Sequence, residues 1–217
     1  MGVAHRKWKR LGAAFAALGS MLAGCAPSVA PPLPLPLPLP AMTAERCLRG
    51  LDESGVVYQI GPIPASSGPC VVDNPVRVSA ASFPFSHPTL MSCALALDID
   101  RFLGDEVQPL ARYHLKTQIT RLDHLGAYSC RGSTGQAGRW SEHAAGRAID
   151  ISGFELANGA AVSIERDWYP PGPKRDFLRA VAERACRYFS VVLTPDSNKE
   201  HYNHIHVDIG PYRLCSL

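Results

Sequence analysis

The chain has 217 residues, of which 46% are hydrophobic and 19% charged. This balance excludes a wholly disordered protein and leaves room for one ordinary globular domain with a sizeable core. The formal net charge of +3 depends on the first 24 residues, which hold four of the 22 bases and no acid. The remaining 18 bases face 19 acids, so the rest of the chain lacks the basic footprint of a nucleic-acid-binding domain.

The N-terminus predicts an export signal. A basic stretch over residues 5–10 precedes an apolar, Ala-rich stretch over residues 11–23, which has the length of a signal peptide and is too short to span a membrane. The apolar stretch ends in Leu-Ala-Gly-Cys25, which resembles a bacterial lipobox and implies that Cys25 is lipidated. The alternative is a plain secretory signal in which Cys25 has no role. We expect a lipoprotein signal peptide over residues 1–24 and a protein anchored by lipid in the bacterial cell envelope, facing the periplasm.

The segment that follows, residues 25–43, predicts a spacer. Leu and Pro alternate up to Pro40, and each Pro fixes its own φ and favours an extended residue before it. Such a segment is expected to form a semi-rigid polyproline II spacer. Its 14 residues 27–40, at about 3.1 Å each, would reach about 43 Å. The alternative is a ligand for a Pro-binding module.

The hydrophobic pattern beyond the spacer predicts helices mixed with hairpin strands. Helices are expected over residues 44–52, 91–103, 105–115 and 174–189. Strands are expected over residues 56–60, 76–78, 118–122, 148–156, 160–164, 191–193 and 204–209. Gly55 is the expected stop of the first helix, and Asn158-Gly159 is the strongest hairpin signal. Together these elements predict an α+β fold over residues 44–217, with helices packed on a small, mostly antiparallel sheet.

The seven cysteines predict disulfides. With Cys25 set aside for the lipid, six remain in an exported chain, and an even number in an oxidising periplasm predicts three disulfides. No two cysteines are spaced as CxxC, which argues against a thiolate zinc site or a thioredoxin-type site. We expect the sequential pairing, which is Cys47–Cys70, Cys93–Cys130 and Cys186–Cys215.

Three of the eight histidines, His201, His204 and His206, fall within six residues. In a strand, His204 and His206 would project to one side together with Asp208, while Ile205 points into the core. Two neutral imidazoles side by side suit zinc. The alternatives are ordinary strand histidines, with His201 a loop residue and Asp208 a partner of a ligand. The other histidines without a motif, His87, His114 and His124, are expected at the surface or in packing.

A second cluster lies in residues 141–150, with the sequence SEHAAGRAID. His143 and Asp150 are seven residues apart, and the small residues between them let the backbone pass close to a site. Asp150 stands among apolar residues of an expected strand, where an unpaired carboxylate is costly. A bound cation would remove that cost, so the pattern favours a metal site on the sheet.

These residues carry a resemblance. The segment SEHAAGRAID matches the motif SxHxxGxAxD and therefore resembles the D-alanyl-D-alanine metallopeptidases. Residues 204–206 resemble the HxH motif of the wider group that includes lysostaphin-type peptidases and hedgehog domains. More narrowly, residues 93–215 resemble the bacterial extensin-like C-terminal domain family, through SCALAL, YSCR, SEHAAGRAIDI, ACRYF and HxHxD. The resemblance covers about residues 44–217 and implies a zinc peptidase-like domain.

The resemblance also implies roles for single residues. His143, Asp150 and His206 correspond to the three zinc ligands, with water in the fourth position of a catalytic site. His204 corresponds to the non-ligand histidine that assists catalysis, and Arg131 to an arginine that stabilises the oxyanion. The alternative for Arg131 is an ordinary ion-paired surface residue.

The sequence departs from the peptidases in one place. They carry a Glu three residues before the last ligand His, whereas this chain has Asn203 there, and its nearest acid is Glu200, four residues before His204, as in the hedgehog domain. We expect Glu200, partly buried so that its pKa is raised, to act as the base, with His204 at the oxyanion and His201 as the substitute base. If none of them is placed to do so, the domain binds zinc without hydrolysis.

The sequence therefore predicts a zinc-dependent peptidase that acts in the periplasm on peptidoglycan stem peptides or cross-links. The alternative is a non-hydrolytic zinc domain that binds peptidoglycan or an envelope partner. A structural role of the plant cell-wall type has no support, because extensin repeats rich in Ser and hydroxyproline are absent.

Overall fold

The computed structural model of the chain describes residues 43–61, 68–133 and 138–217. The predicted signal peptide, the lipidated Cys25 and the spacer up to residue 42 lie outside the described residues. Within the described ranges, no helix combines the length and the apolar character that crossing a membrane requires.

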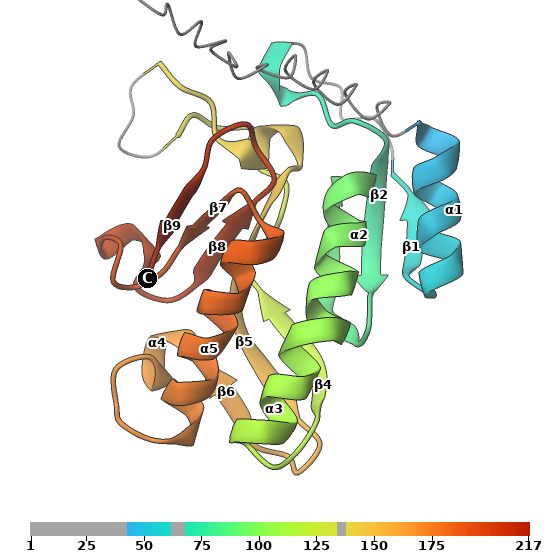
Figure 1. Cartoon of the computed structure of the whole chain (residues 1–217). Coiled ribbons are helices and arrows are strands. Elements are labelled where there is room, and N and C mark those ends of the chain that lie inside the picture. Colours follow the sequence, from blue (N-terminus) through green and yellow to red (C-terminus); the bar gives the residue numbers. More distant parts are fainter. Residues whose placement is uncertain (1–42, 62–67, 134–137) are drawn as a thin grey trace, which may run out of the picture. The chain divides into compact units, whose positions relative to one another are not determined.

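The described strands form one mixed sheet of nine strands in the order β1-β2-β3-β4-β5-β8-β7-β9, with β6 paired to β5 (Figure 1). The strands are β1 (Val57–Ile60), β2 (Pro75–Ala80), β3 (Pro84–Ser92), β4 (Ile119–His124), β5 (Ala148–Leu156), β6 (Ala161–Ser163), β7 (Val191–Leu193), β8 (Ile205–Asp208) and β9 (Leu214–Ser216). Neighbouring strands are antiparallel except β3 with β4 and β7 with β9. The predicted α+β fold with a mostly antiparallel sheet is confirmed.

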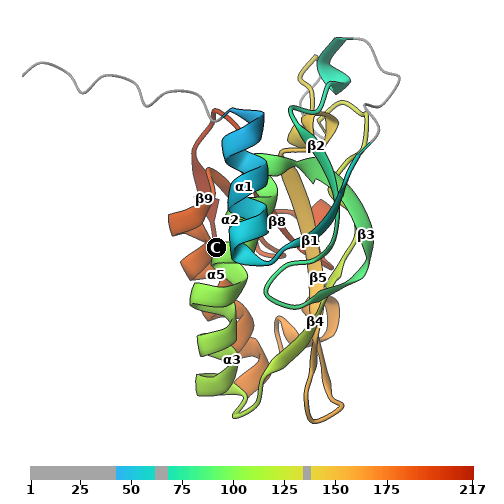
Figure 2. The same ribbon diagram turned by 90° about the vertical axis from the view of Figure 1, so that its right-hand side faces the viewer.

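The long helices cover one face of the sheet. They are α1 (Ala44–Ser54), α2 (Cys93–Phe102), α3 (Gln108–His114) and α5 (Pro173–Tyr188), and a short α4 (Ile164–Asp167) follows β6. A π-helical turn, Leu103–Val107, joins α2 to α3. Figure 2 shows α1, α2, α3 and α5 on one side of strands β2, β3, β4 and β5. Between them lies one core, whose largest fully buried side chains include Trp168, Phe102, Phe154 and Phe177.

Local sequence explains where the helices begin and end. The side chain of Thr43 accepts a hydrogen bond from the N–H of Arg46 at the start of α1, and Gly55 ends that helix in the left-handed conformation, as predicted. Ser92 caps α2 in the same way by accepting from the N–H of Leu95. Because Ser92 is the cap, α2 begins at Cys93, two residues later than expected, and Met91 belongs to β3.

Two strands were not predicted. β3 contains Pro84 and Pro88, which read as strand breakers in the sequence. In the structure its pairing with β2 shifts register between Val78 and Ala80, so that Pro88 lies outside the paired positions and Pro84 at the strand start. β9 is only three residues long and lies parallel to β7.

The disulfide pairing corrects the expected one in two of three bonds. Cys47 pairs with Cys93 and Cys70 with Cys130, whereas the expected Cys186–Cys215 bond is confirmed. The sequential pairing was wrong because α1 packs on the start of α2, which brings Cys47 to Cys93 across the three intervening strands β1, β2 and β3. Three disulfides indicate an oxidising, extracytoplasmic compartment.

Candidate metal centre

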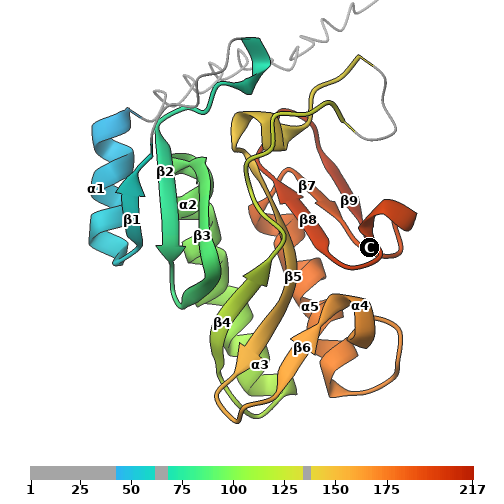
Figure 3. The same ribbon diagram turned by 180° about the vertical axis from the view of Figure 1, so that it is seen from behind.

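Strands β5 and β8 lie side by side in the sheet and carry two of the predicted ligands (Figure 3). Asp150 of β5 is the direct antiparallel partner of His206 of β8, so their side chains project from the same face at the shortest cross-strand spacing. Their neighbours Ile205 and Val207 are fully buried on the other face, as the alternating pattern predicted. The apolar sheet thereby fixes the direction of both polar side chains.

The third predicted ligand, His143, comes from a short 3₁₀ helix, Glu142–Ala145. The side chain of Ser141 caps this helix by accepting from the N–H of His143, and Gly146 ends it in the left-handed conformation at φ 61°. A side chain at Gly146 would force its neighbours to move, because a Cβ there would lie 2.8 Å from Cγ1 of Val72 and 3.1 Å from the backbone nitrogen of Ser92. The motif glycine therefore allows the close approach that brings His143 onto the sheet.

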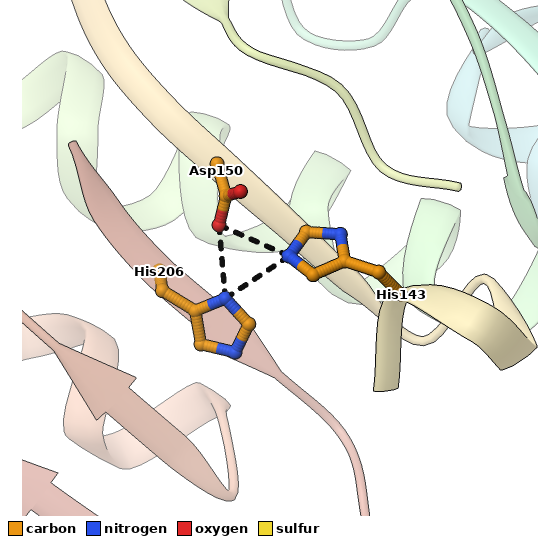
Figure 4. Close-up of side chains that lie close together, drawn as sticks. All are labelled: His143, Asp150 and His206. Carbon is orange, nitrogen blue, oxygen red and sulfur yellow. Dashed lines mark hydrogen bonds and ion pairs between the residues drawn. The ribbon is translucent and has the colours of Figure 1, made fainter. Parts of the chain in front are cut away.

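The three side chains converge on one buried point (Figure 4). Nε2 of His143 lies 3.1 Å from Oδ1 of Asp150 and 3.2 Å from Nδ1 of His206, and that Nδ1 lies 2.9 Å from the same Oδ1. Two imidazole nitrogens and one carboxylate oxygen at such separations could hold a metal ion. Histidine and carboxylate side chains are common ligands of zinc in proteins.

Groups behind the two histidines hold each ring in one orientation. Nδ1 of His143 donates to the carbonyl oxygen of Ala127 at 2.8 Å, which holds the ring with Nε2 facing Asp150. Nε2 of His206 lies 3.3 Å from Oδ2 of Asp208, whose other oxygen accepts from the N–H of Gly210 at 2.8 Å. Asp208 thus contacts a candidate ligand from behind, which is how metal-binding histidines are commonly oriented.

The electrostatics of the triad follow from its burial and its contacts. Burial by itself would raise the pKa of Asp150, but hydrogen bonds from His143 and His206 hold that pKa well below its usual range. Burial would likewise lower the pKa of His206, but hydrogen bonds to Asp150 and Asp208 outweigh it and raise the pKa to about 9. The site therefore favours positive charge at the point where the three side chains meet, and a cation there takes the place of a proton.

The segment before β8 brings the remaining histidines to the same place. His204 lies with its Nε2 3.5 Å from Oδ1 of Asp150, and its Nδ1 lies 2.9 Å from Oδ1 of Asn203. The ring centroid of His201 is 5.0 Å from that of His204 and 5.9 Å from that of His206. Burial, followed by the nearby imidazoles, lowers the pKa of His201 to about 4, and burial also lowers the pKa of His204. Glu200, expected to be partly buried, is exposed.

One cleft of about 330 Å³ collects all of these groups. Its lining includes the three triad residues and the four residues predicted to act in catalysis, which are Arg131, Glu200, His201 and His204. The individual roles of these four residues stay predictions, but the structure places them around one cavity.

Sequence reasoning missed several residues of the cleft and its frame. Arg139 and Trp140 stand immediately before the motif and could have been found from that position, whereas nothing in the sequence singles out Tyr212. The carbonyl of Ala127, which accepts from His143, could not be predicted from the sequence, because any residue type can supply a backbone carbonyl. The three histidines without a motif are outside the cleft lining: His87 is exposed, His114 is half-buried, and His124 is buried and packed on the rings of Phe85 and His87.

Comparison with known proteins bears on the family. The family model described as extensin-like protein C-terminus matches residues 45–216. Searches of curated proteins and of solved structures each found no match. The match covers nearly the whole of the chain that the structure describes, including the motif SEHAAGRAID and the histidines before and in β8. The chain belongs to the extensin-like protein C-terminus family.

Proposed function

We propose that this protein is a zinc-dependent hydrolase that cleaves a peptide bond. The observation that carries the proposal is the convergence of His143, Asp150 and His206 in the wall of a cleft. Structural zinc sites are closed by four protein ligands, whereas catalytic sites have three and leave one position for water or substrate. Three donors in a cleft fit the catalytic arrangement.

His143, Asp150 and His206 would hold a zinc ion, which would act as a Lewis acid, polarising a carbonyl group and lowering the pKa of water toward about 7. The protein must then supply a proton acceptor, and we assign this role to Nε2 of His201, whose lowered pKa of about 4 keeps the ring neutral, and so able to accept a proton, near pH 7. Oδ1 of Asn198 accepts from the N–H of Glu200 at 3.0 Å, and Nδ1 of His201 lies 2.7 Å from the same oxygen. Because that oxygen is an acceptor, Nδ1 of His201 carries the proton, and Nε2 has the free lone pair.

Two further assignments follow from the same reasoning. With Nδ1 of His204 donating to Asn203, a neutral His204 has no proton on Nε2 to offer a developing oxyanion. We therefore assign oxyanion stabilisation to Arg131, which is always charged and lines the cleft. His204 then positions substrate or relays protons beside Asp150.

The proposed substrate is a peptide of peptidoglycan. Two things support this class: the resemblance of the ligand motif to D-alanyl-D-alanine metallopeptidases, and the three disulfides, which indicate the oxidising compartment where that polymer lies. We further propose that Cys25 is lipidated and holds the domain at a membrane, with the Pro-rich segment as a spacer.

The test is the zinc-loaded protein incubated with muropeptides, with products read by mass spectrometry. The parent should release peptide fragments, and His201→Gln should keep its zinc but lose at least about a hundredfold in turnover, the usual scale of losing a general base. Glu200→Gln is the matched control, because it is the neighbouring residue and lines the same cleft, and it should stay within a few fold of the parent.

Two results would change the assignment. A large loss in Glu200→Gln with normal turnover in His201→Gln would transfer the role of base to Glu200. A zinc-loaded parent that cleaves no muropeptide would contradict the hydrolase, and the domain would then be a non-hydrolytic zinc domain that binds peptidoglycan or an envelope partner.

A further inference from the structure

Residues 194–198 join β7 to the 3₁₀ helix Lys199–His201, which carries the proposed base. They belong to no helix or strand. Thr194 is nevertheless fully buried and Ser197 half-buried, and each of the five residues takes part in a hydrogen bond or an ion pair. A loop with so many contacts is held in one position.

Two hydroxyl groups of this loop converge on one carbonyl group of β9. Oγ1 of Thr194 donates to the carbonyl oxygen of Ser216 at 3.1 Å, and Oγ of Ser197 donates to the same oxygen at 3.0 Å. A carbonyl oxygen has two lone pairs and a hydroxyl has one proton, so both lone pairs and both protons are used. Each hydroxyl also accepts from a backbone N–H, that of Asp196 at 3.3 Å for Thr194 and that of Thr194 at 2.8 Å for Ser197. A closed set of hydrogen bonds therefore holds the loop on β9.

Two further contacts hold the same loop. The hydroxyl of Tyr169 donates to the carbonyl oxygen of Pro195 at 3.2 Å. Arg179 of α5 forms an ion pair with Asp196, and its guanidinium carbon lies 4.2 Å from the ring centroid of Trp168. The loop is therefore held by three parts of the chain, which are β9, the segment after α4, and α5.

The loop ends at Asn198, which contacts His201 twice. Its side-chain oxygen lies 2.7 Å from Nδ1 of His201, and its carbonyl oxygen accepts from the N–H of His201 at 3.2 Å. Because Ser197 directly precedes Asn198, a shift of Ser197 would displace both contacts and thereby the ring. A base must lie within hydrogen-bond reach of the proton that it accepts, and a misplacement of about 1 Å can cost about a hundredfold in rate.

We propose that Thr194 and Ser197 are positioning residues, which bind the loop to the carbonyl of Ser216 and so fix the place and orientation of the ring of His201. The proposal rests on the proposed function, because it concerns the base assigned there. Neither Thr194 nor Ser197 lines the cleft, so neither is placed to contact substrate or metal. Their removal should therefore affect turnover and leave the binding of substrate and zinc unchanged.

The first test measures the kinetics of muropeptide cleavage by the zinc-loaded protein. Thr194→Val and Ser197→Ala each remove one hydroxyl group, and each should lower kcat at least about tenfold with KM nearly unchanged. Thr194→Ser keeps the hydroxyl group and should keep most of the turnover. Ser79→Ala is the matched control, because Oγ of Ser79 donates to the carbonyl of Val57 at 3.2 Å at the opposite edge of the sheet, and it should match the parent.

The second test does not depend on hydrolysis. Long-range proton–nitrogen NMR spectra at neutral pH show which ring nitrogen of a neutral histidine carries the proton, and the signal of His201 is identified by its loss in His201→Gln. The parent should carry the proton on Nδ1, which faces Asn198. Thr194→Val and Ser197→Ala should give a mixture of the two tautomers, whereas Ser79→Ala should match the parent. Zinc content is determined for every variant and should stay unchanged.

A lower kcat together with a mixture of tautomers supports the positioning role. A parent that cleaves no muropeptide, with the mixture still appearing in both variants, contradicts the hydrolase alone. In a parent that hydrolyses, a change in kcat without a change of tautomer, or the reverse, would overturn the positioning role, because the effect would then not act through His201. Parent-like behaviour of both variants, or a loss of zinc in either, would overturn it as well.

Discussion

His143 and His206 are oriented by two different kinds of group. Behind His143 stands a backbone carbonyl, that of Ala127, and behind His206 stands the carboxylate of Asp208. A carboxylate makes the imidazole opposite more basic than a carbonyl does, so the two ligands differ in electronic character although they are the same residue type. Ala127 is itself held by β3, because its N–H donates to Oγ1 of Thr89 at 3.1 Å. The orientation of His143 therefore depends on β3 as well.

The triad gives a direct prediction about metal content. Replacing His206 by Ala removes one of three donors and leaves Asp150 buried without its nearest partner, so bound zinc should fall well below one ion per chain. Elemental analysis after dialysis against a zinc buffer measures this. His114→Ala on α3, outside the cleft lining, is the control and should keep the stoichiometry of the parent. An unchanged zinc content in His206→Ala would mean that the metal binds elsewhere.

His124 gives a prediction about pH. It is 3% exposed, its Nε2 donates to the carbonyl of His87 at 3.0 Å, and burial lowers its pKa below 6.5. As the pH falls below 6.5 the unfolded chain binds a proton that the folded chain resists, so the free energy of unfolding falls, by up to about 1.4 kcal/mol per unit of pKa difference. His124→Phe keeps the aromatic packing but cannot titrate, and should lose less stability between pH 7.5 and 5.5.

Urea unfolding of both proteins at the same zinc concentration checks this prediction, with His114→Phe as the control for an added phenyl ring. The charged and titratable neighbours His87, Asp123 and Asp150 are the same in parent and variant. Equal losses in the parent and in His124→Phe would show that burial of His124 does not contribute to acid sensitivity.

At the scale of elements, the tight turn at Gly146 fixes the position of the 3₁₀ helix that carries His143. Gly146 and Gly159 both have positive φ, 61° and 81°, but only Gly146 has neighbours within reach of an added Cβ. We expect Gly159→Ala to cost about 1 kcal/mol, from backbone strain alone, and Gly146→Ala to cost about 2–4 kcal/mol, because overpacking is added to the strain. Denaturant unfolding measures both, and zinc affinity should fall only in Gly146→Ala. Equal costs in the two variants would contradict the role of close packing.

Elements with strong local signals were predicted from the sequence, and elements defined by distant partners were not. The hairpin of β5 and β6 was found because Asn158-Gly159 determines its turn locally, and α5 because its apolar residues recur at helical spacing. β3 and β9 are strands only because β2 and β7 pair with them, which no local pattern records. The same division holds for the site: the motif residues were found, but not the carbonyl of Ala127 or the stacking of Arg139 on the ring of Tyr212.

At the scale of the molecule, two disulfides of similar loop length have different positions. The Cys47–Cys93 bond joins α1 to α2. The Cys70–Cys130 bond joins the segment before β2 to the segment that leads into Arg131. Their sequence separations are 46 and 60 residues, so in the chain-entropy model each stabilises the fold by about 4 kcal/mol. The two bonds should thus contribute similarly to stability and differently to the cleft.

Paired substitutions test this difference. Cys47→Ala with Cys93→Ala, and Cys70→Ala with Cys130→Ala, should lower stability to denaturant by similar amounts. Only the second pair should weaken peptide turnover in the variant that remains folded, because Cys130 adjoins Arg131, which lines the cleft. Peptide mapping of the unreduced parent should recover all three bonds and no free thiol among the described cysteines. Similar effects of both pairs on turnover would show that the position of Arg131 does not depend on this disulfide.

The place of β8 in the sheet also determines the order of events in time. It lies between β5 and β7 in the sheet, yet it is the second to last strand in sequence, and Asp150 and His206 are 56 residues apart. The entropy of closing so long a loop is lost before the contacts between the strands can form, which makes such pairing slow. Until β8 arrives, β5 has an unpaired edge and the site lacks one donor. A chain that emerges N-terminus first therefore acquires its metal-binding ability in one of its last folding steps, so metal retention reports that folding is complete.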